Sequence, residues 1–140
     1  MSDTLHATCI AIGGRAVLLA GGSGCGKSDL ALRLIDRGAR LVSDDYTCLR
    51  AEDGRLIASA PATIAGKLEV RGVGIIEVAA LEAAPVCLLA DLERVPERLP
   101  DPATVSLAGL DVPAIALAAL EASAPIKLER ALIRFGLSLP

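Results

Sequence analysis

The sequence predicts an α/β domain with a mixed β-sheet, and three patterns in its first half support this class. Short apolar runs alternate with glycine-marked turns, as at residues 6–12, Gly13-Gly14 and residues 16–20, a pattern typical of a hairpin that ends in a buried strand. Residues 28–37 have apolar side chains at helical spacing. A strand, a loop, a helix and a further strand indicate an α/β domain, and hairpins require antiparallel pairs, so the sheet should be mixed.

The predicted helix at residues 28–37 has defined neighbours on its C-terminal side. Gly38 follows the last apolar residue and is well placed as the C-terminal cap, because glycine readily adopts the left-handed conformation found there. Residues 40–43 are expected to form a short strand that ends at Asp44-Asp45.

The strand pattern continues to about residue 95 and then breaks up. Asp53-Gly54 predicts the turn of a second hairpin. After Val95 four prolines divide the chain into short pieces, until residues 126–135 offer a closing helix. The strands expected in this part of the chain are residues 46–51, 55–59, 70–78, which Gly72 and Gly74 interrupt, and 86–92.

Length and composition favour one domain over residues 1–140. The chain is 53% hydrophobic but has only Tyr46 and Phe135 as aromatic residues, so the core should be aliphatic. The same scarcity removes the aromatic platforms on which nucleobases stack, and a net charge of -3 does not attract a phosphate backbone. We therefore expect no nucleic acid partner.

The sequence also bears on the compartment. No apolar run approaches the roughly 20 residues that span a bilayer, and the N-terminus has no signal-type pattern, so we expect a cytoplasmic protein without a membrane partner. The four cysteines contain no CxxC pair, which favours reduced thiols over a zinc site or disulfides. They are Cys9, Cys25, Cys48 and Cys87.

Residues 21–28 carry the motif on which the functional interpretation depends. They match G-x-x-x-x-G-K-[ST] completely, between an apolar strand and an amphipathic helix. Glycines let successive N–H groups turn inward, and the helix N-terminus adds its positive end. Lys27 should reach the β- and γ-phosphates and the Ser28 hydroxyl should be a magnesium ligand, which predicts a single P-loop domain that binds ATP and Mg²⁺. The predicted nucleotide-binding residues are Gly21, Gly22, Ser23, Gly24, Cys25, Gly26, Lys27 and Ser28.

Two adjacent carboxylates follow the strand predicted at residues 40–43. Asp44 and Asp45 can therefore stand at the end of that strand beside the phosphate loop, where a carboxylate could hold the metal or accept a hydroxyl proton. A solvated turn after a strand is the alternative interpretation of the same two residues.

Two segments of the chain resemble the HPr kinase/phosphorylase family. The first is GGSGCGKSDLALRLIDRGARLVSDD, which includes an RG-x-RL-x-x-DD segment. The second, Leu-Glu-Val-Arg-Gly-Val-Gly-Ile-Ile-Glu at residues 68–77, resembles the signature loop of that family, which ordinary P-loop kinases and GTPases lack. The resemblance implies an HPr kinase-like catalytic domain, a serine kinase acting on HPr or an HPr-like phosphocarrier, and a homo-oligomer, namely a hexamer.

The same resemblance implies roles for individual residues. His6 matches the active-site histidine of the family, 22 residues before the loop serine, and Glu69 matches the second magnesium ligand. The aspartate pair would take the proton from the target serine, and Asp45 is favoured over Asp44 for this role. Arg98, in Pro-Glu-Arg-Leu-Pro, matches a catalytic arginine that the family holds in an Asp-Arg-Leu-Gly context.

The chain departs from longer members of the family in three places. It begins just before the catalytic domain, it is short between Ile76 and Val86, and it has no arginine at residues 118–124, where longer members carry a Pro-x-Arg-Pro-Gly-Arg-Asn-like segment linked to phosphorylase action. The third departure predicts an enzyme biased toward the kinase direction or one with altered control by inorganic phosphate.

Other functions compatible with the motif remain open. They are a nucleotide-binding regulatory module without catalysis and a P-loop kinase acting on a small molecule. The chain contains no Asn-Lys-x-Asp element for guanine, which argues against a GTPase. The choice between ATP and pyrophosphate as donor is also left open.

Overall fold

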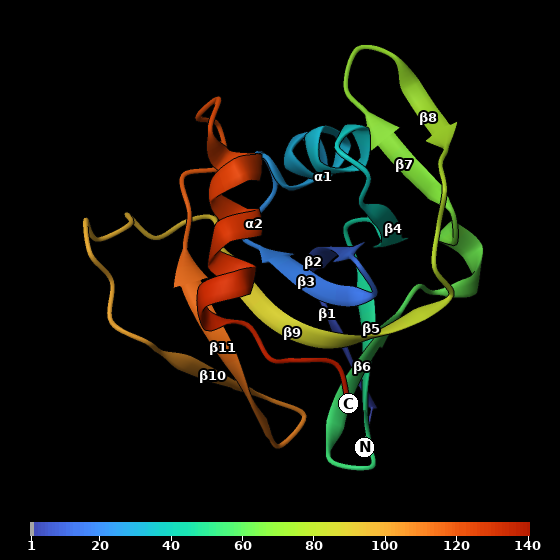
Figure 1. Ribbon diagram of the computed structural model, residues 1–140. Coiled ribbons are helices and arrows are strands. Elements are labelled where there is room, and N and C mark those ends of the chain that lie inside the picture. Colours follow the sequence, from blue (N-terminus) through green and yellow to red (C-terminus); the bar gives the residue numbers. More distant parts are fainter. Residues whose placement is uncertain (1) are drawn as a thin grey trace.

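The computed structural model of the protein describes residues 2–140 and confirms the predicted α/β class with a mixed sheet (Figure 1). Within these residues a nine-stranded sheet stands beside a separate two-stranded hairpin. The elements in chain order are β1 (Ser2–Leu5), β2 (Ala7–Ile12), β3 (Arg15–Ala20), α1 (Lys27–Asp36), β4 (Arg40–Ser43), β5 (Thr47–Glu52), β6 (Arg55–Ser59), a 3₁₀ turn (Ala62–Ile64), β7 (Lys67–Val70), β8 (Gly74–Glu77), β9 (Ala83–Asp91), β10 (Thr104–Leu107), β11 (Leu110–Ala116) and α2 (Ala124–Phe135).

Three parallel strands determine where the loops of the domain meet. Strand β9 pairs in parallel with β3 and with β11, and Asp91 at its end lies beside both Ala20 and Ala116, the last residues of those two strands. The other strand pairs of the sheet are antiparallel, in the order β1-β5-β6-β9-β3-β2-β4 with β10 beside β11. The segments that follow β3, β9 and β11 therefore leave the sheet at one edge.

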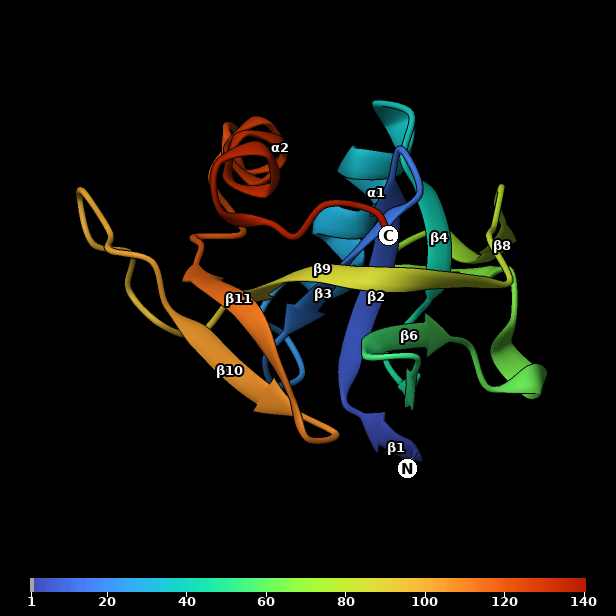
Figure 2. The same ribbon diagram turned by 60° about the horizontal axis from the view of Figure 1, so that its bottom comes forward.

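The central strand β3 is buried on both faces, which explains its nearly continuous apolar sequence. Alternate side chains of a strand point to opposite faces, so Val17 and Leu19 pack in one cluster with both helices, whereas Leu18 packs in a second cluster. Figure 2 shows α1 and α2 on one side of β3 and β9, with β6 and β10 on the other.

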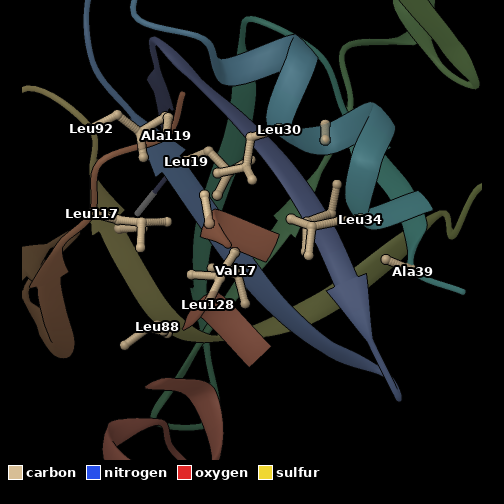
Figure 3. Packing of buried hydrophobic residues seen from close by; sticks show 14 of the residues in the cluster. Val17, Leu19, Leu30, Leu34, Ala39, Leu88, Leu92, Leu117, Ala119 and Leu128 are labelled. Atoms are coloured by element: carbon tan, nitrogen blue, oxygen red, sulfur yellow. The ribbon is translucent and has the colours of Figure 1, made fainter. Parts of the chain in front are cut away.

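The helix-side cluster gives α1 its position. Leu30 and Leu34 of this helix are fully buried against Val17 and Leu19 of β3 (Figure 3). The helical spacing of four residues places both leucines on the same face of α1. Because α1 begins at the end of the phosphate loop, this packing also fixes the loop's C-terminal end against the sheet.

Most of the elements expected from the sequence are present. The hairpin at residues 6–20 is β2–β3, the hairpin around Asp53-Gly54 is β5–β6, and the helix expected at residues 28–37 is α1, which begins one residue earlier. The strand at residues 40–43, the strand near residues 86–92 and the closing helix are found as β4, β9 and α2.

Two expectations were wrong. The single interrupted strand at residues 70–78 is instead the second half of a hairpin, β7–β8, because Gly72 and Gly74 have positive φ angles of 85° and 127° and the chain reverses between them. The proline-rich region after Val95 also contains the hairpin β10–β11. Pro113 lies inside β11, which shows that a proline does not exclude a strand near the margin of a sheet.

The structure also bears on the state of the cysteines and on membrane-spanning helices, two points raised by the composition. All four cysteines are free, and burial raises the pKa of the Cys9 thiol, which therefore stays protonated and packs as a small apolar group. Neither α1 nor α2, nor any other helix within residues 2–140, has the length and apolar character needed to cross a membrane.

Leu34 offers a test of the core between α1 and the sheet. We expect Leu34→Ala to lower the free energy of unfolding by about 2–5 kcal/mol, because it opens a cavity in a closely packed cluster. Ile133→Ala, at a side chain that is 71% exposed on α2, should change it by less than about 0.5 kcal/mol. Equal denaturant midpoints for the two variants in urea would contradict this account of the core.

Candidate active site

The phosphate-loop sequence joins the end of β3 to the start of α1 and folds around a lysine. The Lys27 ammonium donates hydrogen bonds to the carbonyl oxygens of Gly21 at 2.8 Å and Gly22 at 3.0 Å. Lys27 is only 6% exposed. Gly26, just before the helix, has a left-handed φ of 96°, which a side chain would strain. The loop thus places a cation, bonded to neutral carbonyl groups, at the N-terminus of a helix, and both features attract an anion.

A buried carboxylate connects this loop to three other elements. Asp44 follows β4 and is 8% exposed. Its Oδ1 accepts hydrogen bonds from the hydroxyl groups of Ser28 at 2.6 Å and Thr8 at 3.1 Å, and its Oδ2 accepts one from the backbone N–H of Glu69 at 3.0 Å. Both oxygens of Asp44 are therefore engaged, and α1, β2, β4 and β7 meet at this side chain.

The neighbouring carboxylate has a different environment. Asp45 has a φ of 66°, and its side chain is 54% exposed. Its backbone N–H donates to the hydroxyl oxygen of Thr8 at 3.1 Å, and its Oδ1 lies 2.8 Å from His6 Nε2. The ring of His6 stacks on Tyr46, with 4.9 Å between the ring centroids. One face of the Asp45 carboxylate is thus oriented by a histidine, while the side chain remains accessible.

A cleft of about 550 Å³ lies over these groups. This volume is within the range common for small-molecule sites. Its lining residues come from the phosphate loop, α1, the aspartate pair, the β7–β8 hairpin and the segment after β11: Ser23, Gly24, Gly26, Lys27, Ser28, Asp29, Leu32, Asp44, Asp45, Glu69, Val70, Arg71 and Leu120.

The structure brings most of the predicted site residues together. Lys27, Ser28, Asp44, Asp45 and Glu69 line the same cleft. In the phosphate loop Ser23, Gly24 and Gly26 also line it, whereas Gly21, Gly22 and Cys25 contribute to the fold of the loop without lining the cleft. His6 reaches the site through its contact with Asp45.

Arg98 is the exception among the predicted residues. It lies in the exposed segment between β9 and β10 and does not line the cleft of this chain. Its catalytic role stays a prediction.

Sequence reasoning missed two residues that hold the site in place. Thr8 joins Asp44 to the backbone of Asp45, but a threonine in an apolar strand has no distinctive pattern. Glu93 accepts a hydrogen bond from the backbone N–H of Gly22 in the phosphate loop. Its position could have been found, because Glu93 follows a buried strand that pairs in parallel with the strand before the loop.

The oxygen atoms around Ser28 fit a magnesium ion that is shared with phosphates. The Ser28 hydroxyl, the Asp44 carboxylate and Glu69 line one cleft, and oxygen donors are the ligands Mg²⁺ prefers. In the described part of the chain no group of three or more His, Cys, Asp or Glu side chains could hold a metal.

The strand, the glycine-rich loop, the buried lysine and the helix N-terminus together define the class of P-loop proteins. Residues 1–84, more than half of the chain, match the family model "HPr Serine kinase C-terminal domain". The chain belongs to this family, and the resemblance inferred from its motifs is confirmed.

Similarity to individual proteins agrees with the family assignment. The chain is 49% identical over 77 residues to the HPr kinase/phosphorylase of Clostridium botulinum strain Eklund 17B, covering 55% of this chain and 25% of that protein. It is 49% identical over 82 residues to that of Listeria welshimeri, covering 58% of this chain and 26% of that protein. The chain therefore matches about a quarter of the length of these curated relatives.

A solved structure extends the similarity to almost the whole chain. The Hpr(Ser) kinase/phosphatase from Coxiella burnetii superposes with a TM-score of 0.82 at 33% identity, covering 94% of each chain. The HPr kinase-like fold expected from the two motifs is thus found also beyond residue 84, where the family model ends.

Thr8 provides a test of how the aspartate pair is held. We expect Thr8→Val, which keeps the shape but removes the hydroxyl, to destabilise the protein by about 1–3 kcal/mol because Asp44 loses a donor and the Asp45 N–H loses its acceptor. Thr8→Ser should retain most of this stability, since it keeps the hydroxyl. The comparison requires thermal or urea unfolding of both variants, and equal losses would contradict the hydrogen-bond account.

Proposed function

We propose that this chain is an ATP- and Mg²⁺-dependent kinase that phosphorylates a serine of HPr or an HPr-like phosphocarrier protein. The observation that carries the proposal is the placement of an accessible, histidine-oriented carboxylate, Asp45, in the same cleft as the Lys27 phosphate loop. A phosphate donor and a proton acceptor are the two components that transfer to a hydroxyl requires. The names of the related proteins, HPr kinase/phosphorylase and Hpr(Ser) kinase/phosphatase, support HPr as the acceptor.

The phosphate loop would bind ATP, the phosphate donor. The backbone N–H groups of the loop and the N-terminus of α1 would hold the triphosphate, and Lys27 would exchange its bonds to the carbonyls of Gly21 and Gly22 for phosphate oxygens. Bound Mg²⁺ would offset the negative charge of the phosphates, with Ser28, Asp44 and Glu69 as the residues that hold it. Most of the catalysis is then positioning and charge stabilisation.

The two aspartates divide the remaining work according to their surroundings. Asp44 is buried and both of its oxygens accept hydrogen bonds, so it serves as the fixed ligand beside Ser28. Asp45 is half exposed and oriented by His6, so it can approach the incoming serine. The Asp45 carboxylate accepts the hydroxyl proton as the serine oxygen forms its bond to the γ-phosphorus, and ADP leaves.

The β7–β8 hairpin favours a protein over a small molecule as acceptor. Val70 and Arg71 line the cleft, and beyond them Val73 and Ile75 are 74% and 69% exposed near the turn. Exposed apolar side chains beside an active site are suited to contact another protein.

The proposal includes a cytoplasmic location and, from the family resemblance, a hexameric assembly of one catalytic domain per chain.

The direction of the reaction is part of the proposal. The segment after β11 has alanine, leucine and glutamate at residues 118–121 and no arginine before α2. Without that positive charge, inorganic phosphate has less attraction to the site than in longer members, so the kinase direction should dominate over phosphorolysis.

A direct assay tests the reaction and its acceptor. Purified protein is incubated with Mg²⁺, labelled ATP and HPr from the same organism, with HPr whose regulatory serine is replaced by alanine as the acceptor control. Label should appear on wild-type HPr alone and should be lost with Lys27→Ala. ATP binding without any label on HPr would contradict the kinase proposal for this partner. It would favour a nucleotide-binding regulatory module without catalysis or a kinase that acts on a small molecule.

Separate substitutions of the two aspartates test their division of roles. We expect Asp45→Asn to lower kcat by about 10²- to 10⁴-fold, the usual contribution of a general base, while the Kd for ATP stays within about threefold. Asp44→Asn should instead raise the Mg²⁺ concentration needed for ATP binding. Steady-state kinetics and calorimetry distinguish these effects, and the reverse pattern would exchange the two roles.

A further inference from the structure

The segment that follows β11 places an exposed leucine on the phosphate loop. Leu120 lines the cleft although its side chain is 76% exposed. It lies so close to the loop that a Cβ atom at Gly26 would stand 3.0 Å from Leu120 Cδ2. A large apolar side chain in a phosphate-binding cleft has no evident role in holding phosphates, so it requires a separate explanation.

The backbone on both sides of this leucine is anchored. Arg33 of α1 donates hydrogen bonds to the carbonyl oxygens of Ala119 and Glu121, on either side of Leu120, and forms an ion pair with Asp29 at 3.0 Å. Ala119 is 3% exposed, so the turn is also anchored in the core. An arginine and a buried alanine thus fix the backbone around a side chain that itself points to solvent and to the cleft.

The turn at Leu120 lies at the same edge of the sheet as the phosphate loop. Leu117 N–H donates to the carbonyl oxygen of Asp91, so the segment leaves β11 beside the end of β9 and near the phosphate loop after β3. Ligands of open α/β sheets bind in the crevice at the carboxyl ends of parallel strands. Leu32 of α1 adds a second apolar side chain to the cleft.

We propose that Leu120 is the apolar contact for the base of the nucleotide, in a subsite that Arg33 holds beside the phosphate loop. The proposal rests on the nucleotide-binding part of the proposed function and not on the identity of the phosphate acceptor. A leucine contacts the face of a base and does not read its exocyclic groups. Its contribution should therefore be similar for ATP and GTP.

The test separates the base from the phosphates. Calorimetry compares Mg²⁺-ATP, Mg²⁺-GTP and Mg²⁺-tripolyphosphate, which has the phosphates but no base, on the wild type and on Leu120→Ser. We expect the Kd for ATP and for GTP to rise by about three- to tenfold, from the loss of part of one leucine's burial, and the Kd for tripolyphosphate to stay unchanged. Leu120→Phe, which keeps an apolar face, should retain the affinity for ATP.

Ile133→Ser provides the matched control, because it removes an apolar side chain of similar exposure on α2, which does not line the cleft. It should leave all three affinities unchanged. Equal weakening of ATP and tripolyphosphate by Leu120→Ser would overturn the proposal, since Leu120 would then act on the phosphate loop through Gly26. Unchanged ATP affinity with a raised KM for HPr would also overturn it and assign Leu120 to the protein substrate.

The outcomes also separate this inference from the proposed function. A wild-type chain that binds no nucleotide would overturn both. A chain that binds ATP, loses affinity with Leu120→Ser and leaves HPr unlabelled would retain the base subsite and lose only the kinase reaction.

Discussion

The parallel alignment of β3, β9 and β11 is the constraint on which the rest of the structure depends. These three strands end side by side, at Ala20, Asp91 and Ala116. The phosphate loop, Glu93 and the turn at Leu120 follow them directly, so pairing in the sheet is what brings these segments together although they are far apart in sequence. A slip in register would turn every side chain of β3 to the opposite face and break both clusters of the core.

The second constraint is the need to satisfy a buried carboxylate. Asp44 would be costly to bury without donors, and it obtains them from Ser28, Thr8 and the backbone of Glu69. Each donor comes from a different element, so the hydrogen bonds that stabilise the charge also orient the start of α1 and the β7–β8 hairpin around the cleft. Stability and the geometry of the site are thus carried by the same contacts.

The positive and negative side chains of the cleft have different roles. Lys27 lies at the helix N-terminus and favours the phosphates. The aspartates follow β4, which ends at the same edge of the sheet as β3, and they line the part of the cleft where a shared cation and an incoming hydroxyl would be placed. The backbone of the phosphate loop is hydrogen-bonded to Glu93, and Leu120 lies beside Gly26 at its other end. A preorganised cleft of this kind suits phosphoryl transfer, in which positioning dominates.

The sequence by itself determined the local elements and the chemistry of the motif. The hairpins, α1 with its cap and the phosphate loop were predictable because each depends on neighbours in the chain: alternating burial, helical spacing and glycine conformations. The aspartate pair was a candidate from its place after a strand, with a solvated turn as the alternative, whereas Glu69 and the division of roles between the two aspartates came only from the resemblance. The β7–β8 hairpin was missed because two glycines were taken as interruptions rather than as a reversal.

Only the tertiary structure decided which of these residues meet. It buried Asp44 and exposed Asp45, placed Thr8 between them, and brought Glu93 and Leu120 to the phosphate loop from the ends of β9 and β11. It also left Arg98 away from the cleft of its own chain. The physical reason is that such contacts depend on strand order and register, which arise from the packing of the whole sheet and are absent from any short stretch of sequence.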